Sequence, residues 1–111
     1  MSSRSAAFMS GIPELLILKL LSEREMYGYE LAKAVQATTA EALALGEGVL
    51  YPALHALQVT GALRARSAVV DGRKRVYYTL TARGRRRLKE LARRWLQVSG
   101  AVHTVLGGVY G

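Results

Sequence analysis

Apolar residues recur with a helical period through the first half of the chain. Residues 15–21 are apolar on nearly every side, which predicts a central core helix that starts at Pro13, because a proline in a first turn needs no backbone partner. A second helix is predicted over residues 29–38. A third, over residues 49–60, has leucines four and three residues apart that form one apolar face, and Gly61 caps its end.

The period changes to alternation after the third helix. Residues 62–70 and 75–80 favour strands, and the Asp71-Gly72 pair between them is the strongest short-range signal for a β-hairpin. Tyr77 and Tyr78 must point to opposite faces of this hairpin, and the alternation leaves open which of them packs on the core.

A long last helix follows the hairpin. Thr81 is placed to cap its N-terminus, and the helix is expected to run from Ala82 to about Leu106 and to end at the Gly107-Gly108 pair. Residues 1–11 show no apolar period, so we expect them to form a loose N-terminal arm.

The charge of the chain is unevenly distributed. The net charge is +8, but residues 1–63 hold four basic against six acidic side chains, a balance of −2. Residues 64–111 hold twelve basic side chains against two acidic ones, a balance of +10. A basic half on a small domain is typical of a polyanion binder, although the bases of residues 83–94 could also be only a solvated helix face.

The order of helix, helix, helix, hairpin and helix predicts a fold that is mainly α with a small β-hairpin, namely a winged helix-turn-helix plus one long C-terminal helix. The expected divisions are an N-terminal arm (1–11), a winged-helix DNA-binding domain (12–81) and a C-terminal dimerisation helix (82–111). Residues 15–21 are too few to cross a bilayer and include Lys19, so we expect a cytoplasmic protein without membrane contact.

The inventory of reactive side chains argues against an enzyme. The chain has eight carboxylates, two histidines far apart and no cysteine. This leaves no acid–base pair, triad or metal cluster at a workable spacing, and neither glycine-rich break has the pattern of a phosphate loop. We therefore expect neither catalysis, nor a cofactor, nor a metal ion; His103 has no second ligand nearby.

Three stretches of the sequence resemble the PadR family of bacterial transcriptional regulators. The first pairs Leu18-Lys19-Leu20-Leu21 with Tyr27-Gly28-Tyr29-Glu30-Leu31. The second is Gly48-Val49-Leu50-Tyr51-Pro52-Ala53-Leu54-His55-Ala56-Leu57, closed by Gly61. The third is Gly72-Arg73-Lys74-Arg75-Val76-Tyr77-Tyr78-Thr79-Leu80-Thr81, with Gly84 three residues later. The chain departs from the family in the third helix, where arginine and glutamate are common after the Leu-Tyr-Pro motif and His55, Ala56 and Gln58 stand instead.

The resemblance implies a short subgroup member, and the pattern places its DNA contacts on the third helix and the hairpin, with Tyr29 and Lys33 of the second helix as backbone contacts. The third helix would face the major groove and the hairpin, or wing, would reach the backbone or the minor groove beside it. The expected DNA-binding residues are Tyr29, Lys33, Glu47, Val49, Tyr51, His55, Gln58, Arg73, Lys74 and Arg75. Arg64 and Arg66 could reinforce the same surface. The alternatives are that Tyr51 packs on the second helix and that the wing tip is only a solvated turn.

The last helix has an apolar stripe at heptad spacing, which predicts a homodimer. The expected interface residues are Leu88, Leu91, Trp95, Val98, Val102 and Val105. In some short members of the family a tryptophan on this helix lines a pocket across the dimer and stacks on flat hydrophobic drugs. Trp95 could bind a small aromatic effector in that way, or it could simply pack in the interface.

The sequence therefore favours a sequence-specific transcriptional regulator that acts on double-stranded DNA. By resemblance it would be a repressor, active as a homodimer on a palindromic operator and open to relief by a small hydrophobic or aromatic ligand. Two alternatives remain: a nonspecific architectural nucleic-acid-binding protein, which the basic half would also suit, and a winged helix that contacts another protein.

Overall fold

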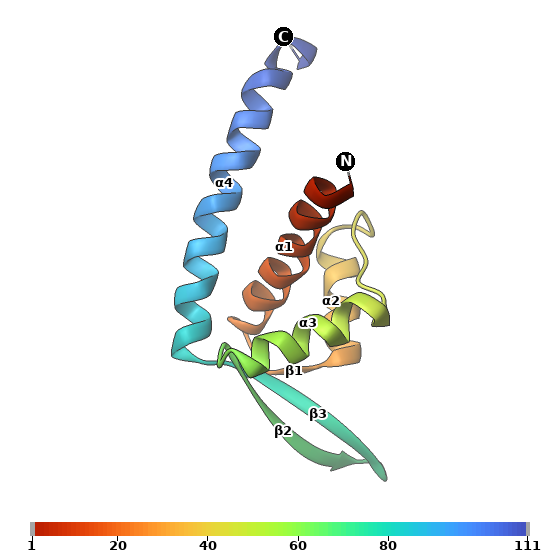
Figure 1. Ribbon diagram of the computed structural model, residues 1–111. Coiled ribbons are helices and arrows are strands. Elements are labelled where there is room, and N and C mark those ends of the chain that lie inside the picture. The colour runs from red at the N-terminus through yellow and green to blue at the C-terminus, as the bar shows by residue number, and fades with distance from the viewer. Residues whose placement is uncertain (1, 111) are drawn as a thin grey trace.

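The computed structural model describes residues 2–110, and the side chains of residues 11–107. Over this range the chain forms four helices and a small antiparallel sheet (Figure 1). The elements in chain order are α1 (Ser2–Leu21), β1 (Met26–Tyr27), α2 (Gly28–Thr38), α3 (Glu47–Val59), β2 (Leu63–Val70), β3 (Arg73–Leu80) and α4 (Ala82–Tyr110). The predicted winged helix-turn-helix with a long C-terminal helix is confirmed.

Helix α1 lies at the centre of the fold, as its all-round apolar pattern predicts. It packs against α2, α3, α4 and the sheet, and Ile17 and Leu18 on it are fully buried. The inner face of α3 adds Leu50, Leu54 and Leu57 to this core. Burial of these leucines fixes the rotation of α3, because the opposite face of the helix must then point to solvent.

The sheet has the strand order β1-β3-β2, and β2 and β3 form the predicted hairpin. Asp71 and Gly72 connect the two strands with positive φ angles of 52° and 75°. Two left-handed residues in succession define the tight turn that suits the twist of a hairpin, and an Asp-Gly pair is well able to adopt them. The first strand of the hairpin starts one residue later than predicted, at Leu63. The second strand starts two residues earlier than predicted, at Arg73, because the turn needs only Asp71 and Gly72.

Strand β1 was not predicted, and it decides how the two tyrosines of the wing are oriented. Met26 pairs with Tyr78, and Tyr27 pairs with Tyr77. Tyr78 shares the face of buried Met26 and packs against the core, whereas Tyr77 lies on the opposite face with Tyr27. Burial raises the pKa of the Tyr78 phenol, since the phenolate would lose its hydration.

The predicted helix boundaries are wrong by the most at the start of α1 and the end of α4, and α3 begins at Glu47, two residues earlier than predicted. Helix α1 begins at Ser2 rather than Pro13, so residues 2–11 of the predicted arm are helical. Once a helix is nucleated by packing, adding further residues is cheap, and one proline near its middle does not end it. For the same reason α4 continues beyond the Gly107-Gly108 pair to Tyr110.

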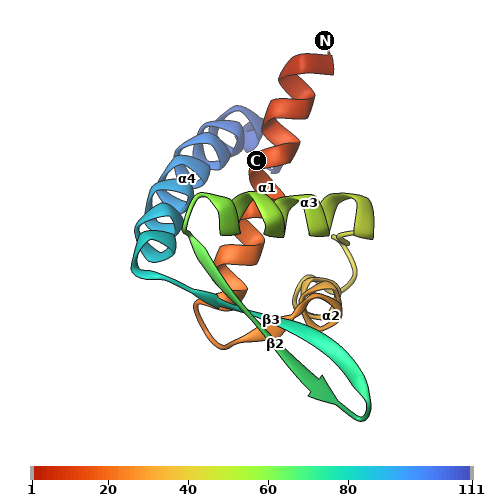
Figure 2. The same cartoon turned by 60° about the horizontal axis from the view of Figure 1, so that its bottom comes forward.

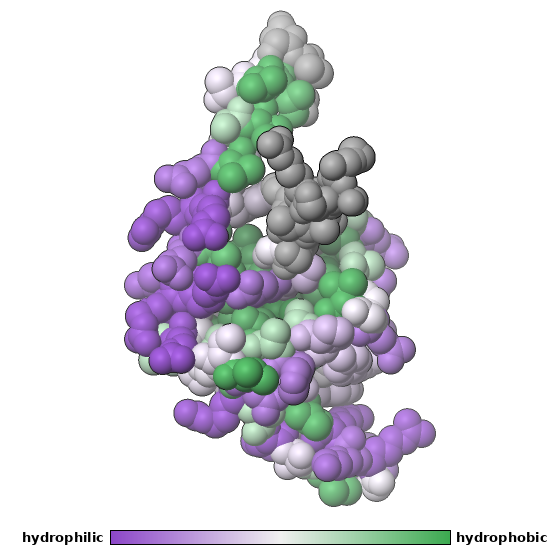
Figure 3. Space-filling view, in the orientation of Figure 1, coloured by the Kyte–Doolittle hydropathy of each residue, from purple (hydrophilic) through white to green (hydrophobic). Residues whose placement is uncertain are grey.

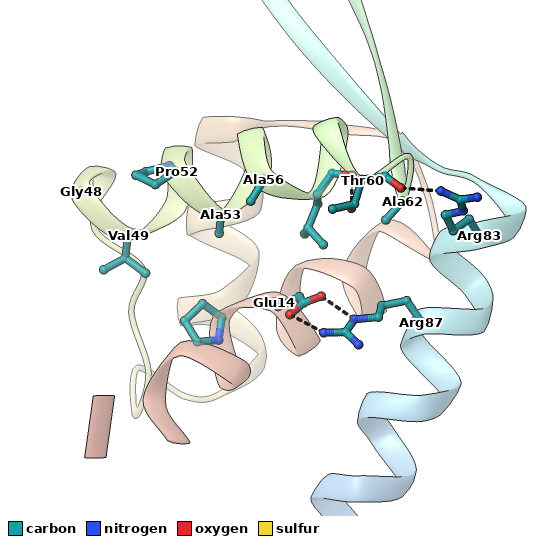
Figure 4. Close-up of a pocket in the computed structure, with 12 residues that line it drawn as sticks. Glu14, Gly48, Val49, Pro52, Ala53, Ala56, Thr60, Ala62, Arg83 and Arg87 are labelled. Carbon is teal, nitrogen blue, oxygen red and sulfur yellow. Dashed lines mark hydrogen bonds and ion pairs between the residues drawn. The ribbon is translucent and has the colours of Figure 1, made fainter. Parts of the chain in front are cut away.

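The first turns of α4 are fastened to the rest of the fold by polar contacts. Thr81 caps the helix, because its hydroxyl oxygen accepts the Gly84 N–H at 3.1 Å. Arg83 donates a hydrogen bond to the Thr60 carbonyl at the end of α3 (3.0 Å), and Arg87 forms an ion pair with Glu14 of α1 (2.8 Å). Both arginines line an open groove of about 800 Å³ (Figure 4). Beyond these contacts α4 extends past the helical body (Figure 1).

None of the helices in residues 2–110 combines the length and the apolar character that are needed to cross a membrane.

Candidate nucleic-acid interface

A groove between the wing and the N-terminal ends of α2 and α3 gathers half of the sequence-predicted DNA-binding residues. Its volume is about 720 Å³. It is lined by predicted residues from α2, α3 and β3, namely Tyr29, Tyr51, Arg73, Lys74 and Arg75. Figure 2 shows the wing projecting from the same side of the molecule on which α3 runs across the body. Elements that are distant in sequence thus form one continuous surface.

Tyr51 connects the groove to the core. Its side chain is 45% exposed, yet the ring lies directly against the backbone of Gly28 at the start of α2. A Cβ atom at position 28 would come within 2.5 Å of the Tyr51 hydroxyl oxygen. The packing alternative for Tyr51 is therefore true of one side of the ring, while the rest of the side chain stays accessible in the groove.

We expect Gly28→Ala to lower the free energy of unfolding by about 1–3 kcal/mol, because the new methyl group overlaps the phenol ring of Tyr51. Urea unfolding followed by circular dichroism measures this loss. Gly100→Ala is the matched control: a Cβ at that helical position meets nothing within 4 Å, so stability should rise by up to about 1 kcal/mol. Equal effects of the two substitutions would contradict the close packing of Tyr51 on Gly28.

The remaining candidates on α3 are exposed but lie outside this groove. Glu47, His55 and Gln58 all point away from the buried leucine face of the helix. Val49 is also exposed, and it lines the second groove, between α1, α3 and α4 (Figure 4). The outer face of α3 is thus exposed along the helix, and of its candidate residues only Tyr51 lines the groove beside the wing.

On α2, Tyr29 and Lys33 form a small exposed unit. The Lys33 ammonium lies 5.4 Å from the centre of the Tyr29 ring, and Tyr29 is itself stacked on Tyr27 at 6.4 Å. Tyr29 lines the groove, and Lys33 lies beside it over the ring of Tyr29.

An aromatic and ionic cluster on the outer face of the sheet was missed by sequence reasoning. Arg66 makes two hydrogen bonds to the Glu25 carboxylate, at 2.7 and 2.6 Å, and its guanidinium lies 4.8 Å from the centre of the Tyr77 ring. Arg75 lies 4.5 Å from the centre of the Tyr27 ring. Tyr27 and Tyr77 touch edge to face at 5.4 Å. We call these five residues the wing clamp.

No local signal could have revealed the wing clamp, because Glu25 and Arg66 are 41 residues apart in sequence. The clamp also changes the expectation for Arg66, whose guanidinium is engaged by Glu25 rather than held open for DNA. The hydrogen bonds from Arg66 lower the pKa of the Glu25 carboxyl below its usual range.

This pKa shift predicts a pH-dependent contribution of Glu25 to stability. A carboxyl whose pKa is lowered by folding stabilises the native state above its unfolded pKa of about 4.3, and the stabilisation disappears as the pH falls through the folded pKa. Wild-type protein should therefore be more stable than Glu25→Gln at pH 7, and the two should converge under acid conditions. Urea titrations from pH 7 to pH 3 test this, and a difference that stays constant with pH would contradict it.

The wing tip differs from the wing clamp. Arg73 and Lys74 are exposed, and among the described residues neither side chain takes part in a hydrogen bond or an ion pair. Their charges are thus not neutralised within the chain. They are the basic groups of the groove that are most available to an anion.

Helix α4 presents an apolar stripe that is only partly covered. Leu91 is buried in the core of its own chain and Leu88 packs against the same core, so the open part of the predicted seam begins at Trp95. Exposure then increases along the helix, from 37% at Trp95 to 82% at Val105. Figure 3 shows this apolar surface on the part of α4 beyond the body and the hydrophilic side chains nearer its start.

A three-helix body with an exposed third helix and a basic wing on one surface defines a winged-helix transcription regulator. The fold and the charge of the groove both meet this description. The model of the transcriptional regulator PadR-like family matches residues 17–90, which is two thirds of the chain. The chain belongs to this family.

Relatives of similar length agree with the assignment. A transcriptional regulator of Mycobacterium tuberculosis is 35% identical over 108 residues, covering 91% of this chain and 96% of its own. The structure of a transcriptional regulator from Clostridium thermocellum is similar, with a TM-score of 0.81 and 26% identity over 88% of this chain and 96% of the other. A PadR family transcription regulator from Clostridium difficile has a TM-score of 0.67 and 27% identity, with 89% and 98% covered.

Members of the family regulate transcription and bind DNA; they are not enzymes. The sequence-based predictions of a winged-helix regulator, of DNA as a partner and of a non-enzymatic role are therefore confirmed at this level.

Proposed function

We propose that this protein is a repressor that binds a palindromic operator as a homodimer and reads its sequence through α3. The observation that carries the proposal is the groove in which Tyr51 of α3 faces Arg73, Lys74 and Arg75 of the wing. A helix in the major groove supplies base contacts, and basic groups beside it fix the register on the phosphates.

The exposed face of α3 suits this task. His55 and Gln58 lie one turn and two turns beyond Tyr51, and both can exchange hydrogen bonds with base edges. Glu47 and Val49 lie in the first turn of α3. Tyr29 and Lys33 lie on α2, where they would contact the phosphate backbone beside α3. These seven residues and the three wing bases, Arg73, Lys74 and Arg75, are the proposed DNA-binding set.

The open stripe on α4 supports the homodimer. Trp95, Val98, Val102 and Val105 follow one another at three- and four-residue spacing on a helix that extends beyond the body. A second copy of the same stripe would cover these side chains, and a two-fold axis would then present two α3 helices to two half-sites. Leu88 and Leu91 would support the base of the interface from within each protomer.

Val102→Glu is expected to raise the dimer dissociation constant by at least about tenfold, since each protomer would bury a carboxylate without a partner. Analytical ultracentrifugation over a concentration series measures the change. Gln97→Glu adds the same charge at an exposed position outside the stripe and serves as the control. A wild-type protein that remains a monomer at every concentration would contradict the proposed dimer.

A small aromatic effector could enter beside Trp95. A pocket of about 160 Å³ lies between α1 and α4, and its lining is apolar apart from Arg94: Gly11, Ile12, Leu15, Leu91, Arg94, Trp95 and Val98. Its apolar walls and one indole suit a flat hydrophobic molecule. Because Trp95 is the one tryptophan of the chain, saturable quenching of its fluorescence by a planar probe such as proflavine supports the effector site. Linear, unsaturable quenching argues against it.

The proposed function is tested by comparing binding to operator DNA with binding to a scrambled duplex over a salt series. Fragments bound in a genome-wide selection supply the operator. Specific repression predicts a preference for the palindrome that persists as salt rises, because base contacts do not depend on counterion release. Equal affinities for both duplexes at every salt concentration would favour the nonspecific architectural alternative instead.

A further inference from the structure

We propose that the basic residues of the wing are divided between two tasks: Arg73 and Lys74 contact DNA, whereas Arg75 is a positioning residue that holds the wing at a fixed angle to the helical body. This inference rests on the proposed function, in which the wing lies against DNA beside α3. In the sequence, nothing in the run of three basic residues separates the role of Arg75 from the roles of Arg73 and Lys74.

The surroundings of Arg75 differ from those of the other two bases. Its guanidinium covers the ring of Tyr27 at 4.5 Å, and its side chain is half-buried. The Tyr77 side chain, two residues along the same strand and on the same face, raises the pKa of the guanidinium. A guanidinium that is stacked on one tyrosine and half-buried beside another has little freedom to turn toward a phosphate.

The contact between Arg75 and Tyr27 joins the wing to the helical body. Tyr27 belongs to β1, which directly precedes α2, whereas Arg75 belongs to β3 in the wing. Strand β1 has only two residues, so its backbone pairing alone is a short hinge for a hairpin with eight residues in each strand. The stacked pair bridges this hinge on the outer face of the sheet.

Arg66 provides a second bridge across the same hinge. It belongs to β2, and it pairs with Glu25, the residue just before β1, while its guanidinium covers Tyr77. Both strands of the wing are therefore tied to the segment of residues 25–27, each by one arginine. Since two bridges at different points resist both bending and twisting, the wing is held at one angle before DNA arrives, which reduces the ordering cost of binding.

Lysine substitutions separate the two roles because they preserve charge and remove the planar guanidinium. We expect Arg75→Lys to weaken operator binding by about tenfold, since an ammonium cannot stack and hydrogen-bond in the same way. Arg73→Lys should leave affinity within about twofold, because a phosphate accepts either cation. Tyr27→Leu should weaken binding as much as Arg75→Lys, and the double variant should be no weaker than either single one.

The geometry of the wing is measured without DNA. The chain has no cysteine, so Gln36→Cys on α2 and Val69→Cys on β2 allow two spin labels to be attached at exposed sites. Electron–electron double resonance should give a narrow distance distribution in this background. The distribution should broaden with Arg75→Lys and with Tyr27→Leu, and it should stay narrow with Arg73→Lys. If Tyr27→Leu does not fold, Glu25→Gln replaces it, because it cuts the other bridge.

The two measurements separate failure of this inference from failure of the proposed function. An unchanged distance distribution in Arg75→Lys would overturn the positioning role, whatever the DNA result. So would additive losses of affinity for Tyr27→Leu and Arg75→Lys, which would indicate a direct contact between Arg75 and DNA. A protein with the expected distance distributions but no preference for an operator would leave the wing clamp intact and overturn the proposed function.

Discussion

Replacing Arg73 and Lys74 together by glutamine is expected to weaken operator binding by on the order of a hundredfold at moderate salt. A dimer would lose four cations at its two wing tips. Each phosphate contact contributes about 0.9 to the slope of log affinity against log salt, so the slope should fall by up to about 3.6. Fluorescence anisotropy with a labelled operator at several potassium chloride concentrations measures both quantities.

The change in slope is what makes this prediction specific to the wing tip. Arg85→Gln with Lys89→Gln removes the same charge from exposed positions on α4, away from the groove, and should reduce the slope by less than about 1. If both double variants lose the same slope, the wing tip has no privileged contact with phosphates. The binding would then come from the general positive field of the protein.

Leu54→Ala is expected to lower the free energy of unfolding by about 2–5 kcal/mol. Leu54 is fully buried in the middle of the inner face of α3, and it packs with residues of the central helix α1. Removing most of its side chain leaves a cavity that neighbouring leucines cannot fill without leaving their own rotamers. Since α3 also carries the proposed reading face, loss of this anchor should reduce operator binding at temperatures where the variant is partly unfolded.

Val59→Ala is the matched control for Leu54→Ala. Val59 lies on the same helix and is 71% exposed, so its substitution should change stability by no more than about 0.5 kcal/mol. Both variants are unfolded in urea at one protein concentration, because dimer formation makes the apparent stability depend on concentration. A cost below about 1 kcal/mol for Leu54→Ala would show that α3 is not anchored by its leucine face.

Local patterns in the sequence were sufficient for the four helices, the hairpin and their order, but not for the short strand β1. The leucine spacing of α3 predicted its buried face, and the Asp71-Gly72 pair predicted the hairpin turn, because period and turn chemistry depend on neighbouring residues alone. They were insufficient for helix ends. Propagation of α1 back to Ser2 depends on a nucleus held by tertiary packing, which the residues at its end do not reveal.

The residues of the candidate site could be named from the sequence, but their roles could not be separated. Arg73, Lys74 and Arg75 form one basic run in which no neighbour distinguishes one from another. Likewise, Leu91 and Trp95 are equivalent in the heptad stripe, although only Leu91 is buried within its own chain. The periodicity and the charge of the sequence identify which residues share a surface. They do not show which of these side chains already contact other parts of the same chain.

The sequence by itself thus determined the class of fold, the third helix with its buried face and the basic hairpin, since each depends on residues within a few positions of one another. The tertiary structure alone decided that Tyr78 faces inward, that Tyr51 rests on Gly28 and that Arg66 reaches Glu25. These contacts join segments that are separated by 23 to 52 residues. Their partners are chosen by how the elements pack around α1, and no local pattern encodes that packing.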